Sequence, residues 1–440
     1  MMAQMEEEQV HIPSEGRRLE TPARDALLEH YARTDSISKG ALAFEIIVIA
    51  GLSLWLLGRG LQVTSALPWL ALALGGFGVF RWFLHHVFLN KKKLNEIRPD
   101  AQFGIHNRDS LLALTRRVFA QLGLKPDAAP VFVIRAKDVN AHAVRCELWP
   151  GLHLFNGVFL NRSILHLLDE PELASVVGHE LGHVFPYAPL LSRCYLLHAA
   201  FAGIASFAIT ARLESAAVAI LAPLAILWAL DWVIAFPHLR LSRGIEFLCD
   251  DFGAHAAGLL PALSCEMKIA AEQETRQKLL LRIFEARQQG SPLNLASLAE
   301  AYEAAVPFGK ADPQEFEREF QKFVGQKKSA AGRISLGGFL GFLQDAPSGA
   351  AEEGAEELAA ELRHLQDLPL LPLDRSLYER GSKGWSIGLA ERLTREIESC
   401  PQRVLFQLPV EVDDRTASHP NTTRRVLYLW RNQAHYPVCV

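Results

Sequence analysis

Hydrophobic residues in this chain are concentrated in four long runs rather than spread evenly. The first two runs span residues 41–57 and 66–84, and the short segment 58–65 joins them. The other two runs span residues 196–210 and 215–236 and follow each other almost directly. A helix that crosses a membrane needs about 20 mostly apolar residues. The pattern therefore predicts two transmembrane helical hairpins.

A different interpretation of the runs is that they form buried core helices of a large soluble protein. Tryptophans at the ends of the runs favour the membrane, because indole rings gather at membrane–water interfaces. These tryptophans are Trp55, Trp69, Trp82 and Trp232. Glu45 lies inside the first run, and we expect it either to have a functional role or to face a partner helix or a water-lined groove.

Most basic residues near the ends of the runs fall on one side of the predicted membrane. They are Arg17, Arg18, Arg24, Arg33, Lys39, Arg81, Lys91, Lys92, Lys93, Arg98, Arg240 and Arg243. The two short turns carry only Arg59 and Arg212. Since lysine and arginine remain on the cytoplasmic side, both termini and the long polar segments are predicted to face the cytoplasm. We expect an integral membrane protein of the bacterial inner-membrane type.

The polar segments predict a fold that is mainly α-helical with a small β-sheet. Helical spacing covers 110–122, apolar β-branched residues predict a strand over 130–135, and 152–160 is a second predicted strand. Acidic residues and Pro171 open a further helix that extends to residue 185. The expected organisation is a polar tail (1–39), a first hairpin (40–89), a compact core (90–190), a second hairpin (191–237), a helix (238–260), a helical insert of unknown role (261–414) and a C-terminal block (415–440).

Overall composition excludes some classes of protein. The chain is 50% hydrophobic with a net charge of −4, which excludes disorder as the main state. No basic excess is present to neutralise phosphates, so nucleic acid is not an expected partner. The six cysteines are scattered without a CxxC pair, which indicates a reducing compartment rather than a disulfide framework.

The helix that ends at residue 185 contains the motif HExxH. His179 and His183 are four residues apart, which places both imidazoles on one helical face where they can bind a single zinc ion. Glu180 then lies beside the open coordination position, where it can accept a proton from the attacking water. The alternative is a pair of exposed histidines on an ordinary helix.

A hydrolytic zinc site needs a third protein ligand and one open position. Glu246 and Asp250 are one helical turn apart after the second hairpin. Glu246 is the candidate third ligand, although its spacing fits a solvated helix charge equally well. Asp250 is suited to accept a hydrogen bond from the other ring nitrogen of a ligand histidine.

These motifs resemble the integral-membrane zinc metallopeptidases that include the HtpX heat-shock protease and the CAAX prenyl proteases. The matching blocks are 140–143 with 150–155, 171–183, 242–250 and 418–426. Their order also matches, with a hydrophobic hairpin between the two halves of the metal site. The resemblance implies a zincin-like metallopeptidase core that holds Zn²⁺.

The resemblance assigns roles to individual residues. It implies that His179, His183 and Glu246 bind zinc, that Glu180 is the general base, and that Asp250 supports a ligand histidine. His419 would stabilise the oxyanion, with a purely structural histidine as the alternative. Residues implied to contact substrate are Asn140, Ala141 and Arg425.

Two departures from the family pattern are visible. Residues 146–149 are inserted between the first two elements, which predicts a longer loop there. Cys249 replaces the usual alanine, and we expect it to be a small buried residue.

The predicted function is a membrane-bound zinc metalloendopeptidase that cleaves peptide bonds at the cytoplasmic face. Its substrate would be a polypeptide, such as a damaged or unassembled membrane protein, that adds as a strand beside 152–160. Prenyl-protein cleavage is disfavoured, because that subclass has more spans than four. The alternative function is a catalytically silent membrane scaffold or holdase whose zinc is structural.

Overall fold

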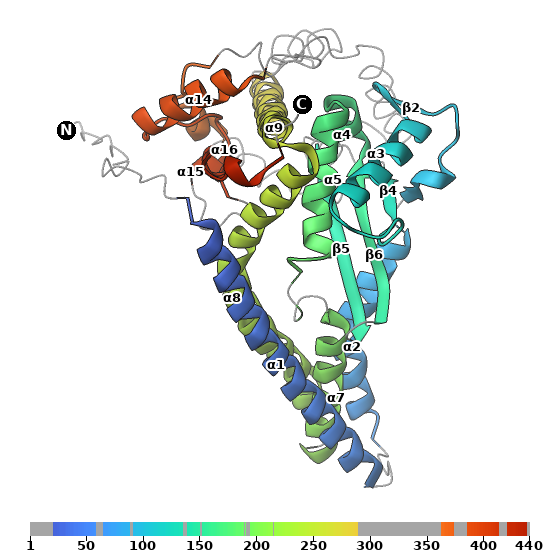
Figure 1. The fold of residues 1–440 in the computed structure, drawn as a ribbon. Coiled ribbons are helices and arrows are strands. Elements are labelled where there is room, and N and C mark those ends of the chain that lie inside the picture. Colours follow the sequence, from blue (N-terminus) through green and yellow to red (C-terminus); the bar gives the residue numbers. More distant parts are fainter. Residues whose placement is uncertain are drawn as a thin grey trace, which may run out of the picture.

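The computed structural model describes residues 21–58, 65–88, 91–134, 139–149, 152–188, 190, 194–213, 215–288, 362–373, 385–412 and 420–437. Four long helices converge at one end of the molecule, and a small sheet and the remaining helices lie at the other (Figure 1). The described chain is mainly helical, which confirms the predicted class of a helical protein with a small sheet.

The four long helices correspond to the four hydrophobic runs. They are α1 (Arg24–Gly58), α2 (Leu67–Phe88), α7 (Tyr195–Leu213) and α8 (Ala216–Ala257). The α2 and α7 backbones approach so closely that a Cβ on Gly75 would lie 2.8 Å from the Cα of Gly203. Small residues at a helix contact are typical of packing in membranes. Glu45 is buried on α1, and its Oε2 lies 2.6 Å from Nδ1 of His198 on α7.

The outer surface of these helices is strongly apolar. Within the described residues, every exposed large hydrophobic side chain except Ile105 and Ile387 belongs to one of the four. One of them, α1, is long and apolar enough in its described part to cross a membrane by itself. The apolar stretches found in the others are shorter, 67–77, 197–213 and 216–226.

Two of the expected boundaries differ from the structure. The sequence predicts a polar tail over 1–39, but α1 already begins at Arg24, whose guanidinium group pairs with Asp251 of α8. The sequence predicts a boundary between the second hairpin and the segment 238–260, but the single helix α8 continues through both. Its length carries the chain directly from the apolar helices to the predicted ligand Glu246.

The main sheet has four strands in the order β1–β4–β6–β5. They are β1 (Lys91–Lys93), β4 (Val131–Ile134), β6 (Leu152–Asn161) and β5 (Ala141–Trp149). β4 and β6 are parallel, and the other two pairs are antiparallel. The longer loop expected over 146–149 is wrong, because these residues extend β5 through two register shifts that absorb the extra length. A small two-stranded sheet pairs β2 (Gln102–Phe103) with β3 (His106–Asn107).

Three helices pack against these strands and build the first hydrophobic core with them. They are α3 (Arg108–Gln121), α4 (Arg162–Leu167) and α5 (Glu170–Val184), and a 3₁₀ turn η1 covers Leu94–Glu96. α5 begins where the sequence predicts, because Asp169 and Glu172 form a reciprocal capping box with each other's backbone N–H. Val158, Leu160, Leu173 and Val177 are among the side chains buried between sheet and helices.

A second core lies beside the first. It is formed by α9 (Leu259–Gln288), α14 (Ile387–Ser399), α15 (Pro409–Val412) and α16 (Thr422–Arg431), followed by a 3₁₀ turn η3 (Gln433–His435). The described parts of the predicted insert 261–414 thus belong to this core, and α9 also packs directly on α5. Lys268 of α9 is fully buried, and its Nζ lies 2.6 Å from Glu172 Oε1 of α5.

Candidate active site

Very close packing of α5 against α8 creates the site. A Cβ on Gly253 of α8 would lie 2.6 Å from the carbonyl oxygen of Ser175, and one on Gly182 of α5 would lie 3.0 Å from Sγ of Cys249. Only glycine leaves room for helices this close. Cys249 is the small buried residue that the sequence predicts, filling the space opposite Gly182. The contact brings the HExxH face of α5 directly opposite Glu246.

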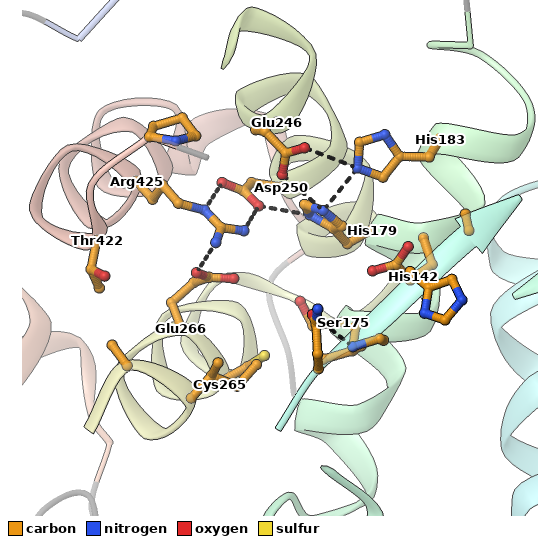
Figure 2. Close-up of a pocket in the computed structure, with 18 of the residues that line it drawn as sticks. His142, Ser175, His179, His183, Glu246, Asp250, Cys265, Glu266, Thr422 and Arg425 are labelled. Carbon is orange, nitrogen blue, oxygen red and sulfur yellow. Dashed lines mark hydrogen bonds and ion pairs between the residues drawn. The ribbon is translucent and has the colours of Figure 1, made fainter. Parts of the chain in front are cut away.

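Three side chains converge across this contact (Figure 2). His179 Nε2 and His183 Nε2 are 3.2 Å apart. His179 Nε2 lies 3.4 Å from Oε2 of Glu246, and His183 Nε2 lies 3.4 Å from Oε1 of the same carboxylate. A tetrahedral zinc with bonds of 2.0–2.1 Å would separate its ligand atoms by roughly 3.3 Å. The two nitrogens are therefore at the spacing that one zinc ion requires, and the Glu246 carboxylate lies within 4.8 Å of both. Two imidazoles and a carboxylate are also the donors that zinc prefers in catalytic sites.

Asp250 orients the first histidine. Its Oδ1 lies 2.8 Å from Nδ1 of His179, which leaves Nε2 directed toward Glu246. Burial by itself would lower the pKa of His179, but hydrogen bonds to Asp250 and Glu246 raise it well above the usual value. Burial by itself would raise the pKa of Asp250, but the Arg425 guanidinium holds it below the usual value. Asp250 is thus a charged acceptor that favours one orientation of the imidazole.

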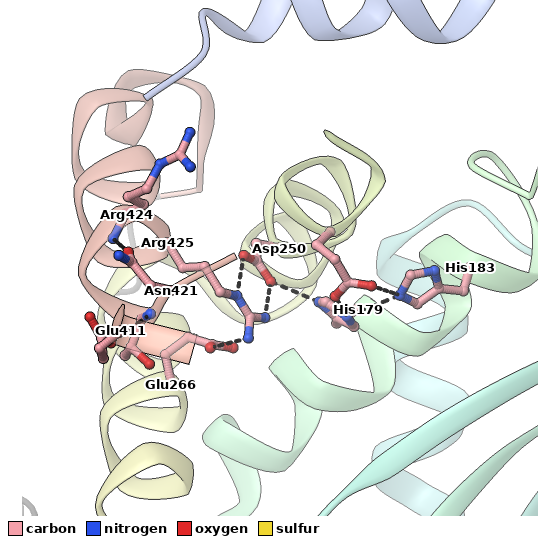
Figure 3. Close-up of polar contacts among 10 residues, drawn as sticks. His179, His183, Asp250, Glu266, Glu411, Asn421, Arg424 and Arg425 are labelled. Carbon is pink, nitrogen blue, oxygen red and sulfur yellow. Dashed lines mark hydrogen bonds and ion pairs between the residues drawn. The ribbon is translucent and has the colours of Figure 1, made fainter. Parts of the chain in front are cut away.

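Arg425 connects the metal cluster to α9. Its Nε donates to Asp250 Oδ2 at 2.8 Å, its Nη2 also donates to Asp250, and its Nη1 lies 2.6 Å from Glu266 Oε2 (Figure 3). Arg425 borders the cavity, so its placement allows contact with a ligand there. The nitrogens of its guanidinium group are nevertheless directed at two protein carboxylates, those of Asp250 and Glu266. We therefore assign it to holding Asp250 and Glu266 in place.

The helix that carries Arg425 is anchored at its N-terminus. Asn421 caps α16 by accepting a hydrogen bond from the backbone N–H of Arg424 at 2.8 Å. The buried carboxylate of Glu411 accepts hydrogen bonds from the backbone N–H of Thr422 and from the hydroxyl of Thr423, both at 3.0 Å. Burial raises the pKa of Glu411 to about 7.

A cavity of about 730 Å³ opens beside the three candidate ligands. Glu180 is buried at 6% exposure and borders this cavity together with Asn140 and Ala141 at the start of β5. The edge strand β5 therefore forms one wall, and α9 forms another. His142 stacks on Phe159 and also borders the cavity. The predicted oxyanion residue His419 lies outside the described residues.

Two residues of this network, Glu266 and Glu411, belong to no motif that the sequence shows. Glu266 belongs to the segment predicted as an insert, and only the docking of α9 reveals that it reaches Arg425. Glu411 lies in the same segment and touches the site only through α16. The sequence carries a helical pattern around Glu266 but no metal-ligand or catalytic spacing that would have identified either residue.

Comparison with known proteins adds one positive result. The family model described as Peptidase family M48 matches residues 106–431, which contain β4, β5 and β6 of the main sheet, and α5, α8, α9 and α16. No curated protein and no solved structure matches the chain. The matched region covers more than half of the chain and includes the whole His–His–Glu cluster. This chain is a member of peptidase family M48.

Proposed function

We propose that this protein is a membrane-bound zinc metalloendopeptidase that hydrolyses polypeptides at the cytoplasmic face of a membrane. The observation that carries the proposal is the convergence of two imidazole nitrogens 3.2 Å apart and the Glu246 carboxylate, all close enough to bind one zinc ion. The cavity beside them leaves one side open, as a hydrolytic zinc site requires. Membership of a metallopeptidase family agrees with this chemistry.

His179, His183 and Glu246 would hold the ion. When bound there, zinc supplies a Lewis acid for the scissile carbonyl and lowers the pKa of water to about 7. Glu180 follows His179 directly in α5 and borders the same cavity. Its carboxylate accepts the proton from the attacking water and delivers that proton to the nitrogen of the leaving amine. Asp250 keeps His179 in the orientation that the site needs.

The edge strand β5 supports binding of an extended peptide. Within the described residues β5 pairs only with β6, so its other edge is available to backbone donors and acceptors of a peptide. Asn140, Ala141 and Ala143 border the cavity at the end of this strand nearest the histidines. The predicted addition of a substrate strand beside 152–160 is wrong, because β6 lies between β4 and β5 and has no open edge. A substrate strand therefore adds to β5.

The apolar surface of the four long helices supports a membrane location. Large side chains such as Phe44, Leu54, Phe77, Leu221 and Trp228 are more than half exposed, where contact with water would be unfavourable. Lipid is the partner that matches this surface. The basic residues near the helix ends favour a cytoplasmic active site. Damaged or unassembled membrane proteins are the substrates that such an arrangement would reach, which suggests a role in membrane-protein quality control.

A catalytically silent scaffold with structural zinc is the competing function. Structural zinc sites are normally closed by four protein ligands. Within the described residues, the cluster that is able to hold a metal consists of three. A structural zinc site also needs no general base, so it gives no role to Glu180 beside the open side of the cluster. These observations favour the enzyme.

The test compares the wild-type protein in detergent with the Glu180→Gln variant. We expect both to retain one zinc per chain, and we expect the variant to cleave casein or a membrane-protein substrate 10²–10⁴-fold more slowly. Glu272→Gln is a matched control, because Glu272 is buried on α9 against Arg276 and does not border the cavity. Zinc-loaded wild-type protein that cleaves no substrate, or full activity of Glu180→Gln, would contradict the proposal.

A further inference from the structure

The wall of the cavity formed by α9 is apolar next to the site and polar beyond it. Cys265, Ile269 and Ala270 of α9 border the cavity, and Val176 of α5 faces it one turn before His179. Gln273 and Gln277 continue the same face of α9. Such a wall matches a side chain that has an apolar stem and a polar end.

Glu266 introduces a carboxylate into this wall. One of its oxygens, Oε2, lies 2.6 Å from Nη1 of Arg425. The other accepts no hydrogen bond within the part of the chain that the structure describes. The side chain remains 13% exposed, and Glu266 borders the cavity. Figure 2 shows its carboxylate between Arg425 and Ser175, on the side of the cavity away from His183.

The surroundings of Glu266 favour a donor that carries positive charge. The two arginines that border the cavity are already engaged, Arg425 with two carboxylates and Arg145 with Glu147 and two backbone carbonyls. The second carboxylate oxygen of Glu266 is therefore an acceptor that no protein donor matches within the described residues.

We propose that Glu266 is a specificity-determining residue that selects substrates with lysine or arginine next to the scissile bond. The inference rests on the proposed peptidase function and names the side chain that this same cavity prefers. The methylene stem of the basic residue lies along Val176, Cys265 and Ile269, and its cationic head binds the Glu266 oxygen that Arg425 does not occupy. Burial raises the pKa of Glu266 to about 7, and a bound cation favours its charged form.

The experiment uses peptides that differ at one residue. Lysine, methionine or glutamate is placed on either side of the bond that the wild-type protein cuts fastest in casein. Methionine matches the unbranched stem of lysine without its charge. We expect kcat/KM for lysine to exceed that for methionine by about 10-fold to 100-fold and that for glutamate by more, as in other charge-matched pockets.

Two variants separate selection from a merely structural role. Glu266→Gln keeps the shape of the side chain, and we expect it to reduce the preference for lysine over methionine to less than threefold. The control Glu272→Gln should keep the wild-type preference. If Glu266 only held Arg425 in place, Glu266→Gln would slow all peptides by one common factor and leave the preference unchanged, which overturns the inference.

A binding measurement makes the result independent of turnover. Fluorescein-labelled peptides of the same series are titrated onto the full-length Glu180→Gln protein and onto Glu180→Gln combined with Glu266→Gln, with anisotropy as the readout. Tighter binding of the lysine peptide to the first protein alone supports the inference. Equal affinities for lysine and methionine peptides overturn it. Absence of cleavage by the wild-type protein would instead contradict the proposed function, while the binding comparison still decides the role of Glu266.

Discussion

Asp250 and Asp251 are neighbours on α8, yet they serve two different regions of the molecule. Both side chains are at most 2% exposed, and each is paired with an arginine that is distant in sequence. Asp250 faces the metal cluster and contacts His179 and Arg425. Asp251 faces a different side of α8, where its Oδ2 lies 3.0 Å from Nε of Arg24 at the start of α1.

The difference shows that a buried Asp–Arg pair does not by itself indicate function. Successive residues of a helix are directed about 100° apart, so one step along α8 changes the partner from the metal cluster to the first long helix. On the first side, Asp250 acts through a candidate ligand. On the second side, the ion pair between Asp251 and Arg24 holds the start of α1 against α8. Substitutions at the two positions should therefore change different properties.

The largest difference is expected in zinc affinity. Asp250→Ala removes the acceptor that orients His179, and groups in this position typically contribute 10-fold to 100-fold to metal affinity. Asp251→Ala should leave zinc affinity within about twofold of the wild type, because Asp251 contacts no candidate ligand. Competition with a chromogenic zinc chelator measures both. Equal losses in the two variants would contradict the division of roles.

The packing of α5 against α8 gives the next largest effect. Gly253→Ala would place a Cβ 2.6 Å from the Ser175 carbonyl oxygen, so the helices must separate. Overpacking of this kind typically lowers the free energy of unfolding by about 1–3 kcal/mol. Gly388→Ala on α14 is the matched control, because its Cβ meets nothing within 4 Å. Thermal unfolding of the two variants in detergent checks the contrast; similar melting temperatures would argue against close packing at Gly253.

Asp251→Ala should lower stability while it spares the metal site. The substitution leaves Arg24, whose side chain is 24% exposed, without its carboxylate partner. Because Arg24 keeps some contact with water, we expect a loss of about 1–2 kcal/mol, below that of a fully buried pair. Chemical unfolding measures the loss. Double substitution of Arg24 and Asp251 should restore part of it, and no restoration would show that the pair does not couple.

A pH dependence is expected at Glu411, which anchors the helix carrying Arg425. Its pKa of about 7 lies above the value of an unfolded glutamate, so the folded protein binds the extra proton between about pH 4.5 and 7. The stabilisation is therefore present at acidic pH and is lost as pH rises through 7. Relative to Glu411→Gln at the same pH, the wild-type free energy of unfolding should fall by about 2–3 kcal/mol between pH 5 and pH 8. A constant difference would contradict the raised pKa.

Local signals predicted the central part of the site. The HExxH spacing, Pro171 and the acidic residues before it are short-range features, and α5 begins and ends close to the predicted limits. The four hydrophobic runs likewise correspond to α1, α2, α7 and α8. The sequence alone left the role of Glu246 open, because one turn of helix suits a ligand and a solvated charge equally. Its position depends on the glycine contact between α5 and α8.

The remaining features depend on tertiary packing that no local pattern encodes. Glu266 reaches Arg425 only because α9 docks on α5 through the buried Lys268–Glu172 pair. Residues 146–149 extend a strand because β6 offers them hydrogen bonds through an irregular register. α1 begins at Arg24 because Asp251, more than two hundred residues away, anchors that arginine. In each case, the partner is distant in sequence and its spacing forms no motif.

X-ray absorption at the zinc edge tests the central claim most directly. The measurement uses the full-length wild-type protein purified in detergent, with the zinc content determined on the same sample. The account predicts one zinc per chain with nitrogen and oxygen ligands only, at about 2.0–2.1 Å, including the two imidazoles of His179 and His183. A sulfur ligand at about 2.3 Å would indicate a site that includes a cysteine such as Cys249, and protein without zinc would exclude a metal site altogether; either result would contradict the account.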